Sequence, residues 1–363
     1  MLKPSSRCVY KAPNPAAFLP RGLMFGAIDR KDIRMRVALL ISLVFVVLAG
    51  CTAEPPEPEI LKTFKVFEGN TIHFAPDDSL KFETATTWPT DAGREINGSI
   101  EIPDFNTSVR ILAKVTTRPI PRDIQDVHDP WDRAGHVRLE TGRGPAIEII
   151  KFITAYGGLT THELDVSYLA PFLKGGVNIV GFVDTWVSPG WEMDFDFNFL
   201  ADRDAKNPVW GKALFNNQDL IAESPEEGPL QVEIPPGLSR VVLHVLVSGH
   251  CTDGRGADEF ETKDHVISVD GNEVKRFRPW RDDCLQFRSV NPYTRRWSDG
   301  SWSSDYSRSG WCPGDKVVPT EFDLTGVLAA GSHTLDYRIE DIRPKNTEGN
   351  FGYWRVSAYL LGW

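Results

Sequence analysis

The chain has 363 residues, of which 41% are hydrophobic and 25% are charged, with 40 Lys+Arg against 50 Asp+Glu. This composition excludes an intrinsically disordered chain, because there are enough apolar residues to form a packed core. The net charge of −10, with no basic block beyond residue 36, excludes nucleic acid as an expected partner. The length predicts two domains, the 26 Pro and 30 Gly indicate many turns, and the 11 Trp indicate a large aromatic core or aromatic binding surfaces.

Residues 1–50 have the features of an export leader. Arg34 and Arg36 precede an uncharged apolar run over 37–50, which is short for a membrane span but suits a secretory signal peptide. The ending Leu48-Ala49-Gly50-Cys51 resembles the lipobox of bacterial lipoproteins, in which the cysteine is lipidated. We therefore expect an exported bacterial lipoprotein of the cell envelope, anchored in the membrane through Cys51, with Met1 or Met35 as its start. The alternative is an uncleaved signal anchor.

Removal of the leader changes the charge and the cysteine count. The leader holds eight cations and two anions, so 32 cations and 48 anions remain, a net charge of −16. Residues 51–60 are rich in Pro and Glu and predict a stiff, solvated tether. Export places Cys251, Cys284 and Cys312 in an oxidising compartment. The simplest allocation of these three is one disulfide plus one free or buried thiol.

The remainder of the chain has the alternation typical of β-strands. In 193–199, Met and Phe alternate strictly with Asp and Asn, which predicts a strand with one buried and one solvated face, and 109–115 alternates similarly. Further strands are expected at 146–154, 177–184, 240–248, 265–269, 273–277, 333–341 and 353–361. Asp270-Gly271-Asn272 predicts a hairpin turn. No helical period beyond about two turns follows residue 60, so we expect an all-β fold of antiparallel sandwiches or jelly rolls.

An internal repetition favours two similar domains. Residues 163–167 (Glu-Leu-Asp-Val-Ser) precede a loop, a Gly-Gly pair and an expected strand, and residues 321–325 (Glu-Phe-Asp-Leu-Thr) precede a loop, Gly-Ser and another expected strand. The segment 201–206 is rich in charged residues and is typical of a linker. The predicted domains are therefore 61–205 and 206–363.

The residues that could carry chemistry are carboxylates. The eight His form neither His-x-His nor His-Glu-x-x-His, so we expect no metal site, and Gly-x-Ser-x-Gly and P-loop motifs are absent. Asp132, Asp184 and Glu259 each lie at a strand–loop boundary beside an aromatic residue, which suits acid–base chemistry on a sugar-like substrate. The alternative for each is a solvated or salt-bridged residue, with Arg133 simply neutralising Asp132 or Asp129.

Six stretches in this part of the chain resemble one known family in the same order. They are Trp131-Asp132-Arg133, Phe152-Ile153-Thr154-x-Tyr156, Asp184-Thr185-Trp186, 193–197, 254–260 and Gly310-Trp311-Cys312-Pro313-Gly314. The family is peptide-N-glycosidase F. The resemblance implies two tandem eight-stranded antiparallel jelly-roll domains packed side by side, with the active site between them. It also implies an amidase that hydrolyses the bond between the Asn side chain and the innermost N-acetylglucosamine of N-glycoproteins or N-glycopeptides, and we expect a monomer without a cofactor.

The resemblance also assigns roles to individual residues. Asp132 matches the primary catalytic aspartate, Glu259 the glutamate that orients water and the chitobiose core, and Asp184 a supporting glutamate that is one methylene longer. The matching positions near the cleft, where substrate binds, are Arg133, Trp186, Arg308 and Trp311. Cys284 and Cys312 fit a family disulfide.

The departures from the family pattern lie in the active-site loops. The family's paired cysteines around the second glutamate are Ala257 and Glu261 here, and no cysteine pair flanks Trp131, so two loops lack a covalent link. Asp258 and Glu261 are expected to raise the pKa of Glu259 by like-charge repulsion and to move activity toward lower pH. These departures keep a second hypothesis open, a lipid-anchored protein that binds glycans without cleaving them. A copper monooxygenase built on similar jelly rolls is disfavoured by the absence of His-x-His.

Overall fold

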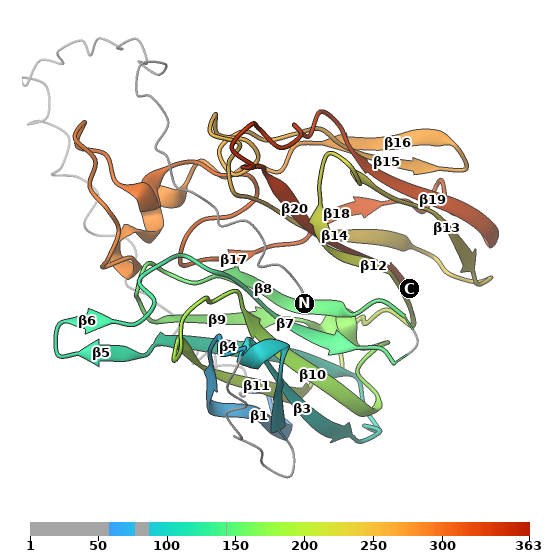
Figure 1. Cartoon of the computed structure of the whole chain (residues 1–363). Coiled ribbons are helices and arrows are strands. Elements are labelled where there is room, and N and C mark those ends of the chain that lie inside the picture. Colours follow the sequence, from blue (N-terminus) through green and yellow to red (C-terminus); the bar gives the residue numbers. More distant parts are fainter. Residues whose placement is uncertain (1–57, 77–86, 143) are drawn as a thin grey trace, which may run out of the picture. The chain divides into compact units, whose positions relative to one another are not determined.

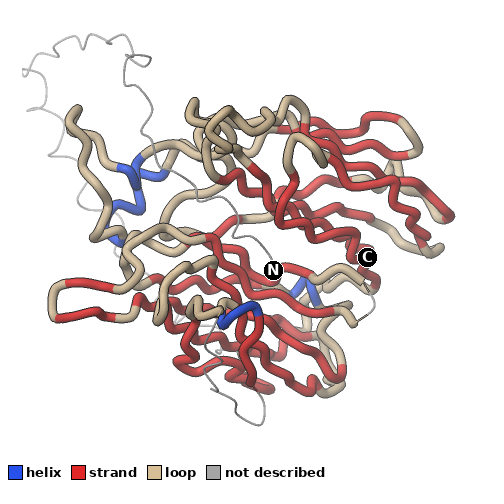
Figure 2. Tube along the Cα trace, viewed as in Figure 1, coloured by secondary structure: helices blue, strands red, loops and turns tan. Residues whose placement is uncertain are grey.

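Strands and turns make up nearly all of the structure, a computed structural model that describes residues 58–76, 87–142 and 144–363 (Figure 2). The expected leader, Cys51 and the tether up to residue 57 lie outside the described residues. The helices are short 3₁₀ segments, Asp91–Gly93 (η2), Ser167–Leu169 (η3), Cys284–Val290 (η4) and Ser303–Asp305 (η5). Within the described ranges, no helix has the length and apolar character to cross a membrane.

Two antiparallel sheets are built mainly by the first half of the chain (Figure 1). The first has the order β1(Ile60–Ile72), β11(Trp191–Ala201), β4(Val109–Pro119), β9(Thr160–Asp165). The second has the order β17(Lys316–Val317), β8(Ile147–Ile153), β7(Ala134–Glu140), β10(Gly175–Val183), β3(Glu95–Ile102), β2(Thr87–Thr90). A small ribbon pairs β5(Pro121–Asp123) with β6(Asp126–Val127). Phe195, Phe197 and Phe199 of β11 are buried in the core of this half, as their alternation predicts.

Two further antiparallel sheets are built by the second half. One has the order β12(Trp210–Leu220), β20(Tyr353–Gly362), β14(Val241–His250), β18(Thr320–Asp323). The other has the order β13(Glu226–Ile234), β19(Gly331–Ile339), β15(His265–Val269), β16(Asn272–Phe277). A second hydrophobic core, including Trp354, Tyr337 and Leu243, contains residues from both sheets.

Three strands are buried on both faces. Every residue of β8 and β14 is buried, as are all residues of β20 except the first. Leu246 of β14 and Tyr359 and Leu361 of β20 belong to the core of the first half, and β20 contacts β8 directly. Burial on both faces explains why β14 has apolar residues in succession instead of alternation.

One strand of the second half completes a sheet of the first. In β17, Lys316 and Val317 pair with Phe152 and Lys151 at the outer edge of β8. The segment leading to β17 is fixed by a disulfide between Cys284 and Cys312, as the resemblance implied. The two halves are therefore joined by backbone hydrogen bonds as well as by side-chain packing.

The prediction of an all-β fold is confirmed, and each expected strand overlaps a strand of the structure. The hairpin turn is confirmed too, because β15 and β16 pair across Asp270 and Gly271, both with positive φ. The internal repetition corresponds to two similar transitions between sheets, from β9 to β10 and from β18 to β19. The boundary at residue 205 falls between β11 and β12, and the division into two eight-stranded jelly rolls stays a prediction.

Candidate active site

Asp132 lies in a short loop that is held by Thr154, the residue directly after β8. The Arg133 amide donates to Thr154 Oγ1 (2.8 Å), and the Thr154 amide donates to the Arg133 carbonyl (2.8 Å). Thr154 Oγ1 also donates to the Trp131 carbonyl (3.2 Å). These bonds fix the backbone on both sides of Asp132, so the position of its carboxyl group is set by β8.

The same loop has a buried anion, Asp129, at its base. The Asp129 carboxylate is fully buried and accepts hydrogen bonds from the Arg133 guanidinium (2.9 Å), Thr185 Oγ1 (2.6 Å) and Trp191 Nε1 (3.2 Å). Thr185 follows β10 and Trp191 begins β11, so Asp129 connects the Asp132 loop to these two strands of the first half. Arg133, predicted to bind substrate, directs its guanidinium to Asp129 instead.

Glu259 lies in the loop between β14 and β15, and its side chain is 8% exposed. Its amide donates to the Cys251 carbonyl (3.1 Å), and its carbonyl accepts from the Ser309 amide (2.9 Å). The backbone of Glu259 is thereby fixed to the end of β14 on one side and to the segment 308–311 on the other. Cys251 has an interaction partner of its own and is not a free thiol.

Arg308 joins the two candidate catalytic carboxylates. Its side chain is fully buried, Nε donates to Glu259 Oε1 (3.1 Å), and Nη2 lies 3.6 Å from Asp132 Oδ2. The remaining N–H groups donate to the carbonyls of Tyr306 (2.9 Å) and Ser303 (3.0 Å), which fixes the plane of the guanidinium. The structure thus brings together Asp132 from the first half and Arg308 and Glu259 from the second.

Aromatic rings enclose this guanidinium. Its carbon lies 5.1 Å from the ring centre of Phe260 and 4.8 Å from that of Trp311. Trp311 is only 3% exposed, and its Nε1 donates to the Gly249 carbonyl (2.6 Å). Trp311 therefore supports Arg308, and its burial does not support a role as a sugar-binding face.

The surroundings of Asp132 raise its pKa, so its carboxyl group is partly protonated near neutral pH. Burial, which disfavours the charged form, raises the pKa of Asp132 to about 7; the charge of Arg308 opposes this shift, and the charge of Glu259 adds to it. A carboxyl group with a pKa near the working pH is suited to take a proton and to return it in a later step.

Asp184 lies between two arginines. Oδ1 lies 3.2 Å from Arg94 Nη1, and Oδ2 accepts from Arg355 Nη2 of β20 (2.6 Å). The Asp184 amide donates to the carbonyl of Ala134, two residues after Asp132 (2.9 Å). Both carboxylate oxygens are therefore engaged by guanidinium groups, and we expect Asp184 to position the Asp132 loop against the second half.

Trp186 is the candidate with an open aromatic face. It is 42% exposed, its ring centre lies 5.0 Å from that of Phe74, and the guanidinium carbon of Arg94 lies 4.8 Å from its ring. Arg94 therefore connects Trp186 to Asp184. An exposed indole supported from behind offers a flat apolar surface of the kind that matches a sugar ring.

Three comparisons with known proteins bear on this site. Residues 219–361 match the family described as peptide-N-glycosidase F, C terminal. Peptide-N(4)-(N-acetyl-beta-D-glucosaminyl)asparagine amidase F of Elizabethkingia miricola is 23% identical over 312 residues, covering 80% of this chain and 84% of the relative. Both comparisons show that the chain is similar to the peptide-N-glycosidase F family. The resemblance carried by the six sequence stretches is confirmed.

Solved structures of the family have the same fold. PNGF-II has a TM-score of 0.71 and 24% identity, with 83% of this chain covered; this chain spans only 65% of the length of PNGF-II. PNGase F, a glycosylasparaginase from Flavobacterium meningosepticum, has a TM-score of 0.63 and 19% identity, covering 83% of this chain and 95% of that structure. At these identities the likeness concerns the fold.

Ion pairs occupy the position of one cysteine link of the peptide-N-glycosidase F family. Glu261, where the family has a cysteine, accepts from Lys263 Nζ (2.8 Å) and Arg343 Nη2 (2.8 Å). Arg343 also pairs with Asp253 at the start of the loop (2.7 Å). The loop that carries Glu259 is therefore closed by charges, and the loop that carries Asp132 is held through Asp129, so both have non-covalent restraints.

The expectation that Asp258 and Glu261 repel Glu259 is not supported by their surroundings. Burial is the largest single influence on the Glu261 carboxyl group and raises its pKa. Lys263 and Arg343 together outweigh burial, so the pKa of Glu261 is lowered overall. Asp258 is 1% exposed, and burial raises its pKa to about 7, so it is partly uncharged at neutral pH. The like-charge contact in this site is the one between Asp132 and Glu259.

Some residues of the site were not singled out from the sequence. The Tyr156 hydroxyl accepts a hydrogen bond from Arg308 Nη2 (3.4 Å), and the Tyr156 amide donates to Asn291 Oδ1 (2.8 Å). Tyr156 was visible only as the last residue of a stretch that matches the peptide-N-glycosidase F family. Arg355 had no sequence signal, because it lies within an ordinary strand pattern.

We expect the substitution Arg355→Met to lower kcat/KM at least about tenfold. It removes the hydrogen bond from Arg355 to Asp184, which allows the Asp132 loop to shift, and small displacements of reacting groups lower the rate strongly. It also leaves Asp184 with one cation fewer, which we expect to reduce the free energy of unfolding by about 3 kcal/mol. Kinetics and urea unfolding measure both effects. The control is Arg110→Met, which removes an exposed ion pair with Asp165. Equal effects of the two substitutions would contradict the positioning role.

The pKa of Asp132 gives a prediction for pH dependence. If the carboxylate is the form that works, kcat/KM rises with pH along a limb with its midpoint near the pKa of about 7. This prediction differs from the sequence-based expectation of activity at lower pH, and the same measurement decides between them. Initial rates at constant ionic strength across acidic and neutral pH measure the limb, and a rate that is already maximal in acid would contradict it.

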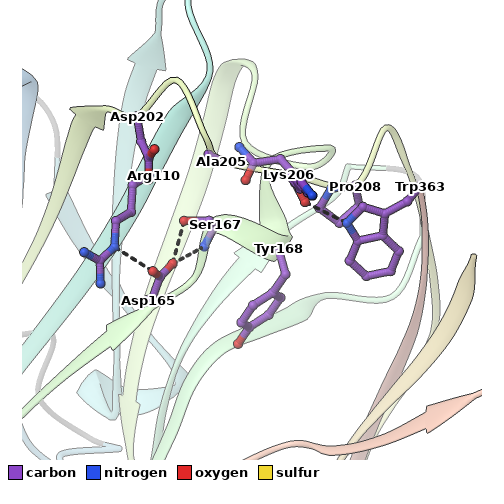
Figure 3. A pocket seen from close by; sticks show the side chains of 10 residues that line it. Arg110, Asp165, Ser167, Tyr168, Asp202, Ala205, Lys206, Pro208 and Trp363 are labelled. Atoms are coloured by element: carbon purple, nitrogen blue, oxygen red, sulfur yellow. Dashed lines mark hydrogen bonds and ion pairs between the residues drawn. The ribbon is translucent and has the colours of Figure 1, made fainter.

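A hollow of about 290 Å³ lies away from these residues (Figure 3). It is lined by the linker residues Asp202, Lys206 and Pro208 and by the C-terminal Trp363. Two of its charged lining residues, Arg110 and Asp165, pair with each other (2.7 Å). Elsewhere, no three His, Cys, Asp or Glu side chains among the described residues gather as ligands for a metal ion.

Proposed function

We propose that the chain is an amidase that hydrolyses the bond between the Asn side-chain nitrogen and the innermost N-acetylglucosamine of N-glycoproteins and N-glycopeptides. The products are an Asp side chain and a glycosylamine. The observation that carries this proposal is the arrangement of Asp132, Arg308 and Glu259, which unites two carboxyl groups from different halves on one buried guanidinium. Similarity to the peptide-N-glycosidase F family supports an enzyme of this class.

The proposed reaction uses the near-neutral pKa of Asp132. The carboxylate takes a proton from a water molecule, whose oxygen attacks the carboxamide carbon and forms a tetrahedral intermediate. Collapse of this intermediate breaks the bond between carbon and nitrogen, and the proton held by Asp132 passes to the leaving nitrogen. Glu259 orients the water, and Arg308 keeps the two carboxyl groups together and offsets their charge.

Incubation of the full chain with a denatured N-glycoprotein in water enriched in oxygen-18 tests the proposal. Amidase action releases the glycan, converts the glycosylated Asn to Asp and places one heavy oxygen in the new carboxyl group. A glycan that is bound but never released would instead support a non-catalytic glycan-binding protein. Release with the innermost N-acetylglucosamine left on Asn would indicate cleavage of a glycosidic bond and would contradict the amidase.

We also propose that the protein acts as a monomer attached to the cell envelope by a lipid at Cys51, with two eight-stranded jelly rolls over 61–205 and 206–363. The lipobox-like run Leu48–Cys51 supports the anchor. Labelling of cells with a radioactive fatty acid, with Cys51→Ser as the control, tests it: label in the wild type alone supports the anchor, and absence of label from the wild type contradicts it.

A further inference from the structure

The loop that encloses Arg308 is basic in an otherwise acidic protein. Between Cys284 and Cys312 the chain has four Arg and two Asp, with no Lys and no Glu, whereas the whole chain has a net charge of −10. Two of these arginines have carboxylate partners: Arg308 pairs with Glu259, and Arg288 pairs with Asp305. A local excess of positive charge therefore remains in this loop.

The excess resides on two exposed arginines, Arg295 and Arg296. Among the described residues, no carboxylate lies within ion-pair distance of either guanidinium, and the nearby Asp299 accepts from the amide and hydroxyl of Ser301. Arg296 contacts Trp302 (5.6 Å to the ring centre), and Arg288 contacts the same ring (4.4 Å). Arg288 and Arg296 therefore share one indole, and of these two only Arg288 has a carboxylate partner, Asp305, among the described residues.

Arg295 is held at the edge of the candidate site. Its guanidinium carbon lies 4.5 Å from the ring centre of Trp131, the residue before Asp132. The backbone around it is ordered by a small hairpin, in which the Ser303 amide donates to the Arg295 carbonyl (2.9 Å) and Arg296 forms a bridge with Trp302. A guanidinium lying against an aromatic face keeps its N–H groups free to donate to a carboxylate in the plane.

We propose that Arg295 and Arg296 form a carboxylate-recognising rim, which makes this chain prefer substrates with an anionic group close to the scissile bond. This inference rests on the proposed function. Asp132 and Glu259 share the single cation Arg308, so the site centre has a net negative charge when Asp132 is ionised. This charge opposes the entry of an anionic substrate, and the rim offsets that repulsion where the substrate approaches. The carboxylate comes either from an acidic residue beside the glycosylated Asn or from an acidic sugar of the glycan.

Three glycopeptides with the same backbone distinguish these sources: one has Glu beside the sequon and a neutral glycan, one has Gln in its place, and one has Gln with a glycan bearing acidic sugars. We expect kcat/KM at low ionic strength to be about fivefold higher for at least one carboxylate substrate than for the neutral one, and the advantage to decline with salt. A preference for the first assigns recognition to the polypeptide, and a preference for the third assigns it to the glycan. Equal values for all three would overturn the proposal.

The double variant R295Q/R296Q tests whether the rim is the source of the preference. We expect the ratio of carboxylate to neutral substrate to fall to about one, while R240Q keeps the wild-type ratio. Arg240 is a matched control because it also lies against an indole, that of Trp363 (5.0 Å). A preference that persists in R295Q/R296Q would overturn the proposal.

A separate measurement distinguishes failure of the rim from failure of the amidase. If the wild type releases no glycan from any of the three glycopeptides, the proposed function fails. Binding of the same glycopeptides to the Asp132→Asn variant, measured by titration calorimetry, then tests the rim alone. Tighter binding of a carboxylate substrate that is lost on adding R295Q/R296Q supports the rim, and equal binding contradicts it.

Discussion

Asp132→Asn is expected to lower kcat/KM by about a hundred- to ten-thousand-fold, because an amide cannot take the proton from water. The substitution preserves the shape of a side chain that is only 7% exposed. Rates measured on a denatured N-glycoprotein or a glycopeptide check the loss. Asp194→Asn is the matched control, because Asp194 is also paired with an arginine, Arg118, but lies on β11 away from the site. A comparable loss in both variants would contradict a specific role for Asp132.

Asp132→Asn is expected to lower activity but to preserve or increase stability. Because the folded state raises the pKa of Asp132 to about 7, it holds a proton that the unfolded chain releases near about pH 4, so this group lowers the free energy of unfolding as pH rises between those values. Asn removes that cost. We expect Asp132→Asn to be at least as stable as the wild type at pH 8, and urea unfolding measures this. A large destabilisation at pH 8 would show that the charge supports the fold instead.

Arg308→Met is expected to reduce the free energy of unfolding by about 3–5 kcal/mol at pH 8, because it leaves two carboxylates buried without their shared cation. Loss of the Arg308 charge also raises the pKa of Asp132 further, so the limb of the pH–rate profile moves to higher pH. The destabilisation is expected to be smaller at pH 5, where Asp132 is protonated. Urea unfolding at the two pH values and the pH–rate profile together check these effects.

A control and a double variant separate this charge effect from simple loss of packing. Arg288 lies in the same loop and against an indole, but it is 29% exposed and pairs with a single carboxylate, Asp305, so Arg288→Met is expected to cost about 1 kcal/mol or less. Adding Asp132→Asn to Arg308→Met removes one of the stranded charges and is expected to restore part of the lost stability. No recovery in the double variant would mean that packing accounts for the loss.

The fold could be predicted where a strand has a clean pattern. Strict alternation identified β11, and strands were also expected at 240–248 and 353–361, which correspond to β14 and β20. Irregular strands were not expected: β1 has several register shifts against β11, β12 has two against β20 and β13 has one against β19, and each shift breaks the period of two. A bulge moves the apolar residues to the other phase of the alternation, so the sequence pattern disappears although the strand remains.

The site could be predicted as a set of residues but not as a geometry. The six short stretches pointed to Asp132 and Glu259, a further matching position pointed to Arg308, and the structure joins the three residues. The ion-pair partner of a charged residue could not be predicted, because Asp184 pairs with Arg355, which is 171 positions away in the sequence. From the sequence alone, a solvated or salt-bridged surface position was the alternative for Asp184. Only the packing of β20 against the first half shows that the pair of Asp184 and Arg355 is largely enclosed.

The pairing of β17 with β8 has a consequence for how the protein is made. Until residue 317 has left the ribosome, the outer edge of β8 has no neighbour, and all seven residues of Ile147–Ile153 belong in the interior. An unpaired apolar edge is a template for association with other chains. The nascent first half is therefore exposed to aggregation throughout synthesis of the second, and a fragment ending at residue 205 keeps that exposure permanently. Truncation at the boundary between the halves thus removes the strand that protects the first of them.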